Sequence, residues 1–146
     1  TIVCEPGRFI VGNSGYFLTK VLYEKVNKDR RFIIVDGGMN DLIRPSLYNA
    51  YHKIEVLDKD SNISKADVVG PVCESGDFLA KNIELPKTSH NDIIVVHSAG
   101  AYGFVMSSNY NTRPKAAEVA IENKKDRIIR ERESFEDLIA KEKRFL

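Results

Sequence analysis

The chain has 146 residues, of which 42% are hydrophobic and 29% are charged, and its 22 basic and 21 acidic residues give a net charge of +1. This composition is typical of one globular domain with a buried core, and the charge balance gives no reason to expect a nucleic acid or an acidic membrane as partner. No apolar run is long enough for a transmembrane helix, and the start, TIVCEPGR, lacks the basic residues and continuous apolar stretch of a signal peptide.

Short strands separated by turns dominate the predicted elements, because apolar and β-branched runs alternate with glycine, proline and polar residues. In chain order, we expect strands at Phe9–Val11, Tyr16–Val26, Phe32–Asp36, Ile54–Leu57, Asp67–Val72, Asp92–Val96 and Glu118–Glu122. Pro45 interrupts residues 42–51, so this stretch is expected to be a loop or a helical turn. Residues 58–66, DKDSNISKA, are expected to form a polar loop.

The end of the chain carries the clearest helix signal. The charged run DRIIRERE (126–133) is most simply a solvated edge strand or a lead-in, and Ser134 can cap a helix, with the aspartate three residues later completing a weak capping box. Phe135, Leu138 and Ile139 then share one face, which we expect to dock on a core. Many short strands and one late helix predict a mainly β fold, an antiparallel barrel or sandwich with a C-terminal helix.

The cysteines and histidines give no sign of a metal site. Cys4 and Cys73 lack the close spacing of metal ligands, and the histidines form no HxxxH or HxH pair. A chain of this size needs no disulfide, so we expect a reducing compartment such as the cytoplasm, and Cys4 is expected to be a small core residue. The chain opens on Thr1 with apolar residues suited to a neighbouring strand, so we expect a fragment whose missing part lies upstream.

Polar, glycine-rich segments recur between the predicted strands. They are EPGR (5–8), GGMNDLIRPSLY (37–48), GPVCESGD (70–77), AGAYG (99–103) and MSSNYNTRP (106–114). Taken singly, each is explained as well by an ordinary turn: Cys73 could be a buried structural thiol, and Arg44 could form a surface ion pair of little energetic value.

Taken together, these segments supply complementary binding groups. Arg8 and Arg44 offer planar forks for carboxylate or phosphate, and Glu74 offers an anion for an ammonium group. Tyr48 and Tyr102 offer hydroxyls, Cys73 offers a thiol, and Gly7 allows close backbone approach to an anion. A ligand that carries phosphate, carboxylate and ammonium groups would use all of them.

The ordered motifs resemble the C-terminal part of the diaminopimelate decarboxylase family. They are EPGRFIVGNSG, DGGMNDLIRPSLYNAYH, VVGPVCESGDFLA, SAGAYGFVMSSNYNTRP, AAEV and IIRERE, and they extend over nearly the whole chain in family order. The resemblance implies an N-terminal TIM-like barrel that holds pyridoxal 5'-phosphate on a lysine, joined to a C-terminal β-barrel of the alanine racemase type. It also implies decarboxylation of meso-diaminopimelate to L-lysine by a homodimer with shared active sites.

The resemblance further implies a division of the chain. Residues 1–13 would be the last strand and linker of the missing barrel, and residues 14–146 would be the C-terminal β-barrel domain with its terminal helix. The lysine that binds the cofactor, and a histidine that stacks on it, would lie upstream. The chain alone should therefore be inactive.

Roles carry over to the matching positions. Glu5, Pro6, Gly7 and Arg8 match a cofactor-contacting segment, in which the arginine also touches substrate. Tyr102 matches a tyrosine that contacts both cofactor and substrate. The expected substrate-binding residues are Arg8, Arg44, Tyr48, Glu74 and Tyr102. Cys73 matches a proton donor that reaches into the active site of the partner subunit.

The chemistry of the residues agrees with these roles. A thiol with a pKa of roughly 8.5 is mostly protonated near neutral pH and can protonate the carbon that loses CO2, and a nearby Glu74 would favour that thiol form. Diaminopimelate has an amino-acid group at both ends, so its far end needs an arginine as well as Glu74. Two alternatives stay open: an ornithine, arginine or carboxynorspermidine decarboxylase, or a non-catalytic regulatory β-domain, against which the retained polar residues argue.

Overall fold

The computed structural model describes residues 1–145 and divides the chain into two compact units, Thr1–Ser107 and Ser108–Leu146. The predicted boundary between residues 13 and 14 stays a prediction, and the last residue of the predicted second domain, Leu146, lies outside the described residues. No helix within the described residues is long and apolar enough to cross a membrane.

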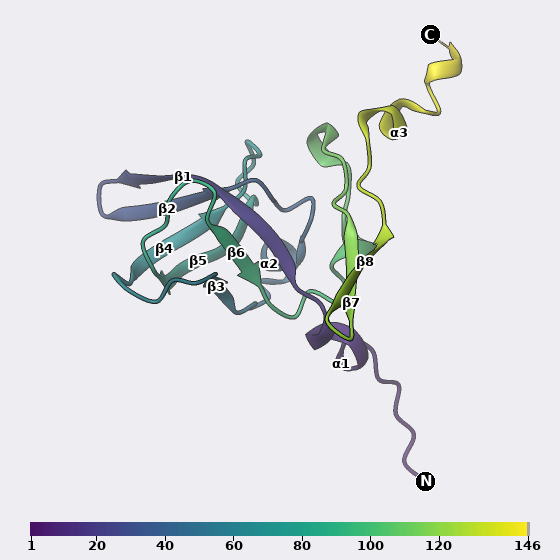
Figure 1. Ribbon diagram of the computed structural model, residues 1–146, viewed down its shortest axis with the longest axis horizontal. Helices are drawn as coiled ribbons and strands as arrows, with labels where there is room; N and C mark the ends of the chain where they lie inside the picture. Colours follow the sequence, from purple (N-terminus) through teal and green to yellow (C-terminus); the bar gives the residue numbers. More distant parts are fainter. Residues whose placement is uncertain (146) are drawn as a thin grey trace. The chain divides into compact units, whose positions relative to one another are not determined.

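A six-stranded sheet forms the first unit, in the order β3-β6-β1-β2-β4-β5 (Figure 1). Its strands are β1 (Phe17–Asn27), β2 (Arg30–Val35), β3 (Ile54–Val56), β4 (Ser64–Val69), β5 (Phe78–Leu85) and β6 (Ile93–Val96). The two outer strands, β3 and β5, contact each other, so the sheet curls into a nearly closed barrel and the predicted mainly β barrel is confirmed. One pair departs from the antiparallel expectation, because β2 and β4 run parallel.

Alternation along the strands builds the core of this unit. In β1, buried Thr19 and Val21 alternate with exposed Leu18 and Lys20, as expected for a strand with one face inward. Residues of the same kind on the other strands fill the interior, and the most deeply buried are Ile33, Val35, Val68, Leu79, Ile94 and Val96. Large-to-small changes at such positions typically cost about 2–5 kcal/mol.

A nearly buried ion pair braces the sheet. Arg31 on β2 donates to both carboxylate oxygens of Glu24 on β1, at 2.6 and 3.2 Å, and to the backbone oxygens of Leu85 and Pro86 at the end of β5. The backbone N–H and the hydroxyl of Thr88 donate to the same carboxylate. Burial alone would raise the pKa of Glu24, but the hydrogen bonds from Arg31 and Thr88 outweigh it, so this pKa lies below its ordinary value.

Several predicted elements differ from the observed ones. Residues Phe9–Val11 belong to a short helix, α1 (Arg8–Val11), instead of the expected strand, because they lie between Gly7 and Gly12 without a neighbouring strand and are all exposed. β4 begins at Ser64, inside the expected polar loop, and ends at Val69, before Val72.

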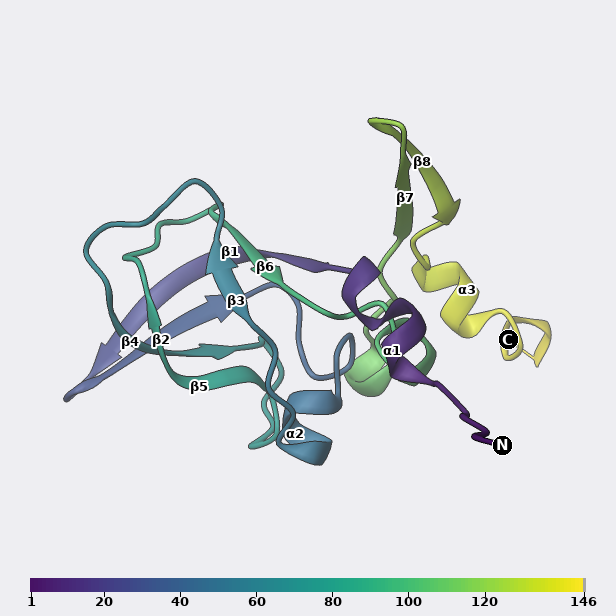
Figure 2. The ribbon, with the colours of Figure 1, turned by 90° about the horizontal axis from the view of Figure 1, so that it is seen from below.

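Strand β5 was absent from the sequence-based expectations. Its pattern is irregular because the pairing of β5 with β4 shifts register and Asn82 has a left-handed backbone with φ of 54°. The first unit also contains α2 (Arg44–Tyr48), in the stretch expected to be a loop or helical turn, and the 3-10 helices η1 (Gly12–Ser14) and η2 (Phe104–Met106). Residues 1–7 form an extended tail before α1 (Figure 2).

The second unit is a hairpin followed by short helices. β7 (Glu118–Glu122) pairs antiparallel with β8 (Lys125–Arg130) through a turn at Asn123 and Lys124, whose positive φ angles suit a tight hairpin. The helices are η3 (Tyr110–Thr112), α3 (Phe135–Ile139) and η4 (Lys143–Phe145).

The predicted capping box at Ser134 is confirmed. The backbone N–H of Asp137 donates to the Ser134 hydroxyl, and the backbone N–H of Ser134 donates to the Asp137 carboxylate. Phe135 is 59% exposed, so the docking of this helix face on a core stays a prediction.

We expect Arg31→Met to lower the free energy of unfolding by about 3–5 kcal/mol, because it leaves the Glu24 carboxylate nearly buried without its cation. Urea unfolding followed by circular dichroism measures this cost. Lys53→Met is the matched control, because Lys53 pairs with Glu55 on the surface, with 61% of its side chain exposed, and its loss should change stability little. Equal destabilisation by the two variants would contradict the role of the Arg31 brace.

Candidate functional site

Two chain segments that carry predicted site residues cross without space for side chains. The backbone N–H of Ala99 donates to the carbonyl of Gly15 at 2.8 Å, and that of Gly100 donates to the carbonyl of Gly12 at 3.0 Å. A Cβ on Gly100 would lie 2.1 Å from the Val11 carbonyl oxygen, so only glycine fits there. The crossing holds the AGAYG loop against the segment that follows EPGR.

Tyr102 projects from this loop with an unusual backbone. Its φ of 57° is in the left-handed region, which costs a residue other than glycine roughly 1–3 kcal/mol and is often found at functional sites. The Tyr102 hydroxyl oxygen lies 3.1 Å from the position that a Cβ on Gly7 would take. The structure therefore brings the predicted EPGR segment and the predicted tyrosine together.

Arg44 stands between two tyrosine rings. Its guanidinium carbon lies 5.5 Å from the ring centroid of Tyr48 and 5.6 Å from that of Tyr102, both within cation–π range. Pro45 stabilises the first turn of α2. Because Tyr48 is four residues after Arg44, the helix brings both side chains to the same face. The Arg44 Nε is buried and has no hydrogen-bond partner among residues 1–145.

His52 is a supporting residue that the sequence reasoning missed. It is 4% exposed, and its Nδ1 lies 2.9 Å from the carbonyl oxygen of His97, which requires Nδ1 to carry the donated proton. Burial is the main cause that lowers the pKa of His52, the His97 carbonyl opposes it, and the positive charges of Arg44 and Arg8 lower it further. The one hint in the sequence was that His52 directly follows the RPSLYNAY run. A lone histidine without a metal-ligand partner is weak evidence for a role at the site.

Arg8 follows Gly7, which lies beside the Tyr102 hydroxyl. The Arg8 side chain is exposed and packs over Gly12, where a Cβ would lie 3.0 Å from its Cγ. Arg44 stacks on the Tyr102 ring and Arg8 follows the glycine at its hydroxyl, so both arginines belong to segments that meet at Tyr102. Glu5 and Pro6 are exposed in the tail before α1, and their cofactor contacts stay predictions.

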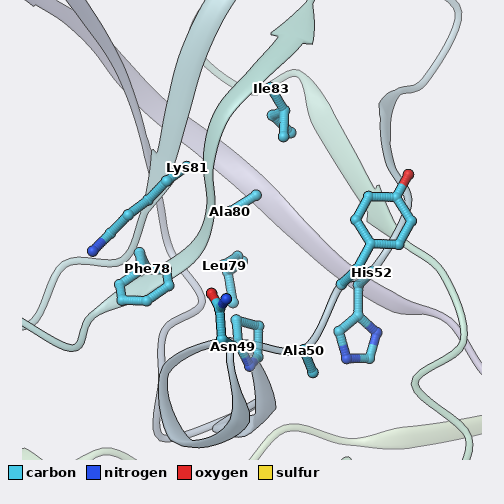
Figure 3. Close-up of a pocket in the computed structure, with 10 residues that line it drawn as sticks. Asn49, Ala50, His52, Phe78, Leu79, Ala80, Lys81 and Ile83 are labelled. Atoms are coloured by element: carbon cyan, nitrogen blue, oxygen red, sulfur yellow. The ribbon is translucent and has the colours of Figure 1, made fainter.

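A small pocket lies beside this cluster, between β5 and the segment that follows α2 (Figure 3). Its volume is about 270 Å³, and its lining includes His52, Asn49, Phe78 and Lys81. None of the predicted site residues lines it, so the predicted site is the surface around Arg44 and Tyr102 and not this pocket.

Cys73 and Glu74 lie on a separate loop, residues 70–77. Both are exposed, so the alternative that Cys73 is a buried structural thiol is excluded for this unit. The Glu74 carboxylate accepts the backbone N–H of Gly76 at 3.3 Å. The carboxylate of Asp77 closes the loop by accepting the backbone N–H of Val72.

The expectation that Cys4 is a core residue is wrong for the described chain. Cys4 is exposed, because residues 1–7 have no secondary structure and none of them packs into the sheet.

Comparison with known proteins gives a consistent result. Residues 3–100 match the family model described as pyridoxal-dependent decarboxylase, C-terminal sheet domain. The chain is 58% identical over 146 residues to a diaminopimelate decarboxylase of Campylobacter jejuni, covering 100% of this chain and 36% of that protein.

Solved structures agree with this match. The crystal structure of diaminopimelate decarboxylase from Helicobacter pylori complexed with L-lysine matches with a TM-score of 0.92 and 54% identity, over 100% of this chain and 36% of that one. A lysine/ornithine decarboxylase from Vibrio vulnificus complexed with cadaverine matches with a TM-score of 0.70 and 24% identity, over 77% of this chain and 30% of that one, and shares the fold.

We expect the protein to lose stability as the pH falls through about 6.5, because the unfolded chain then binds a proton that buried His52 resists in the folded state. Stability from this group is complete above that pH and declines below it. His52→Asn places an amide nitrogen where Nδ1 stands, keeps a donor for the His97 carbonyl, and should flatten the dependence measured by urea unfolding between about pH 7 and pH 5. His90→Asn, at an exposed histidine, is the control, and an unchanged slope in the His52 variant would contradict the assignment.

Proposed function

The chain belongs to the pyridoxal-dependent decarboxylase family, as its C-terminal sheet domain, and from this premise we propose that the protein containing it is a diaminopimelate decarboxylase. It would remove CO2 from meso-diaminopimelate and release L-lysine. The observation that carries the proposal is the 58% identity, over every residue of the chain, to a protein of that name. Because the chain spans 36% of that relative, the activity is proposed for the whole protein and not for this chain alone.

The residues present fit pyridoxal phosphate. The side-chain-free approach of Gly7 to the Tyr102 hydroxyl leaves space and a donor for a planar group, and the exposed Arg8 beside Gly7 offers a cation for its phosphate. Residues that would hold the cofactor are Glu5, Pro6, Gly7, Arg8 and Tyr102. When bound, the cofactor supplies an electron sink for the carbon that loses CO2. The lysine that binds it would lie in the part of the protein outside this chain.

Substrate choice would rest on charge at both ends of the molecule. The Arg44 guanidinium, held between Tyr48 and Tyr102, presents its planar fork to a carboxylate. Arg8 supplies a second cation, and Glu74 supplies an acceptor for an ammonium group. A diacid with two amino groups uses all of these residues, whereas ornithine leaves one arginine without a carboxylate and places its far ammonium near a positive charge.

Cys73 would act as the acid that protonates the carbon after CO2 leaves. Its side chain is exposed, which leaves the thiol accessible to the active site of a partner subunit. We therefore include a homodimer with shared sites in the proposal. A cytoplasmic location would keep this exposed thiol reduced.

The full-length protein, loaded with pyridoxal phosphate, is expected to release CO2 from meso-diaminopimelate with kcat/KM at least about tenfold higher than from ornithine or arginine, a difference of about 1.4 kcal/mol. The measurement is CO2 release with each amino acid at matched concentrations. Preference for ornithine or arginine would make the protein one of the related decarboxylases, and no turnover with any of the three would favour a regulatory domain.

Cys73→Ala is expected to lower kcat for lysine formation by roughly 10²–10⁴-fold, the usual contribution of a general acid, while cofactor absorbance stays at the wild-type level. The other cysteine gives a matched control, because Cys4→Ala makes the same chemical change at a position without an assigned role. Near-wild-type turnover by the Cys73 variant would remove this thiol from the mechanism.

A further inference from the structure

The loop that carries Cys73 is organised by one buried carboxylate. Asp77 is 5% exposed, and each of its two carboxylate oxygens accepts a backbone N–H: Oδ1 from Met39 at 2.7 Å and Oδ2 from Val72 at 2.6 Å. We propose that Asp77 is a positioning residue that holds the Cys73 thiol in place for proton transfer. This inference rests on the proposed decarboxylase function.

The backbone of Asp77 closes the same loop. Its N–H donates to the Glu74 carbonyl at 3.0 Å, and its carbonyl accepts the N–H of Gly70 at 3.1 Å. Together with the Val72 contact, these bonds restrain the residues on both sides of Cys73. An exposed loop without such bonds would sample many conformations, and a displacement of about 1 Å at a reacting group can cost about 100-fold in rate.

Two glycines leave room for the carboxylate. A Cβ on Gly70 would lie 2.4 and 2.5 Å from the Asp77 carboxylate oxygens, and a Cβ on Gly38 would lie 2.7 Å from Oδ1. Such distances are well below normal contact, so the two glycines and the aspartate form one packed unit. The requirement for small residues beside this carboxylate therefore joins three positions that are separate along the chain, Gly38, Gly70 and Asp77.

The bond to Met39 connects the Cys73 loop to the segment that leads into α2. A Cβ on Gly76 would make ordinary 3.6 Å contacts with the Met39 thioether and with Ser46 Cβ, and Ser46 lies two residues after Arg44 in α2. The loop thus rests on the helix that presents the proposed carboxylate receptor. Asp77 therefore fixes the Cys73 thiol relative to the sheet and α2 of its own subunit. This holds whether the thiol protonates substrate in its own subunit or in the partner.

A carboxylate is required here, and its isosteric amide cannot replace it. The side chain of asparagine has one oxygen acceptor, and its NH2 group would face the backbone N–H of either Val72 or Met39. One of these buried donors would lose its acceptor, and an unsatisfied buried group costs about 1–3 kcal/mol. Asp77→Asn therefore removes one anchor of the loop while it keeps the volume and shape of the side chain.

Asp67→Asn is the matched control. Asp67 is also nearly buried, at 6% exposed, and its carboxylate accepts the backbone N–H of Asn82 and pairs with Arg30. This carboxylate joins β4 and β5 away from the Cys73 loop. If Asp77 acted only through stability, the two substitutions would have similar effects on activity.

The test uses the full-length, cofactor-loaded protein and a double-mutant cycle. Asp77→Asn should lower kcat roughly 10- to 100-fold and change KM less than kcat, whereas Asp67→Asn should leave kcat within about threefold of wild type. In a Cys73→Ala background, Asp77→Asn should change kcat by less than about threefold, because the group that it positions is already gone. An equal loss in both backgrounds, or an equal loss from Asp67→Asn, would overturn the proposal.

Amide hydrogen exchange gives a readout that does not depend on the reaction. Asp77→Asn should raise amide exchange across residues 72–76 at least about tenfold, and Asp67→Asn should not. Gly70→Ala is a second variant that displaces the intact carboxylate, and it should give the same exchange and kcat pattern. If the wild-type protein does not decarboxylate diaminopimelate, the proposed function fails, while unchanged exchange in the Asp77 variant defeats the positioning role itself.

Discussion

The arrangement of the candidate site depends on the close crossing of two backbones at Gly15 and Gly100. No side chain fits between them, and two amide hydrogen bonds hold the segments together. Because of this contact, the segment that carries Arg8 and the loop that carries Tyr102 have a fixed relation, although they are about ninety residues apart in the sequence. The Tyr102 ring in turn contacts the Arg44 guanidinium. The contact between Gly15 and Gly100 therefore helps to determine the position of this cation.

The curled sheet supplies the rigid base for these loops. Its interior is filled by aliphatic side chains, and its polar bonds are gathered at a few carboxylates, notably Glu24 and Asp77. Each of these accepts hydrogen bonds from a nearby residue and from one far along the chain, Thr88 for Glu24 and Met39 for Asp77, which ties the ends of strands to loops. Functional side chains can therefore be exposed on loops without losing their geometry.

Much of the fold could be predicted from the sequence, and the sequence also named the candidate site residues, whose roles stay proposals, while the supports of the candidate site could not be predicted. Alternating strands such as β1 and the capping box at Ser134 are local patterns, so they were predicted correctly. β5 was missed because bulges and the left-handed Asn82 disrupt its alternation. His52 and Asp77 were not singled out, because their importance comes from burial and from partners far along the chain, which no local pattern encodes.

The parallel pairing of β2 with β4 has a consequence for how the site can diversify. Parallel neighbours cannot be joined by a tight turn, so the chain must make a long excursion between Val35 and Ser64. That excursion includes β3, which pairs with β6, and the segment before it, which contains α2 with Arg44 and Tyr48 and whose length is not set by strand pairing. Natural variation in substrate range can accumulate in this connection while the barrel and the glycine crossing keep the same sequence demands.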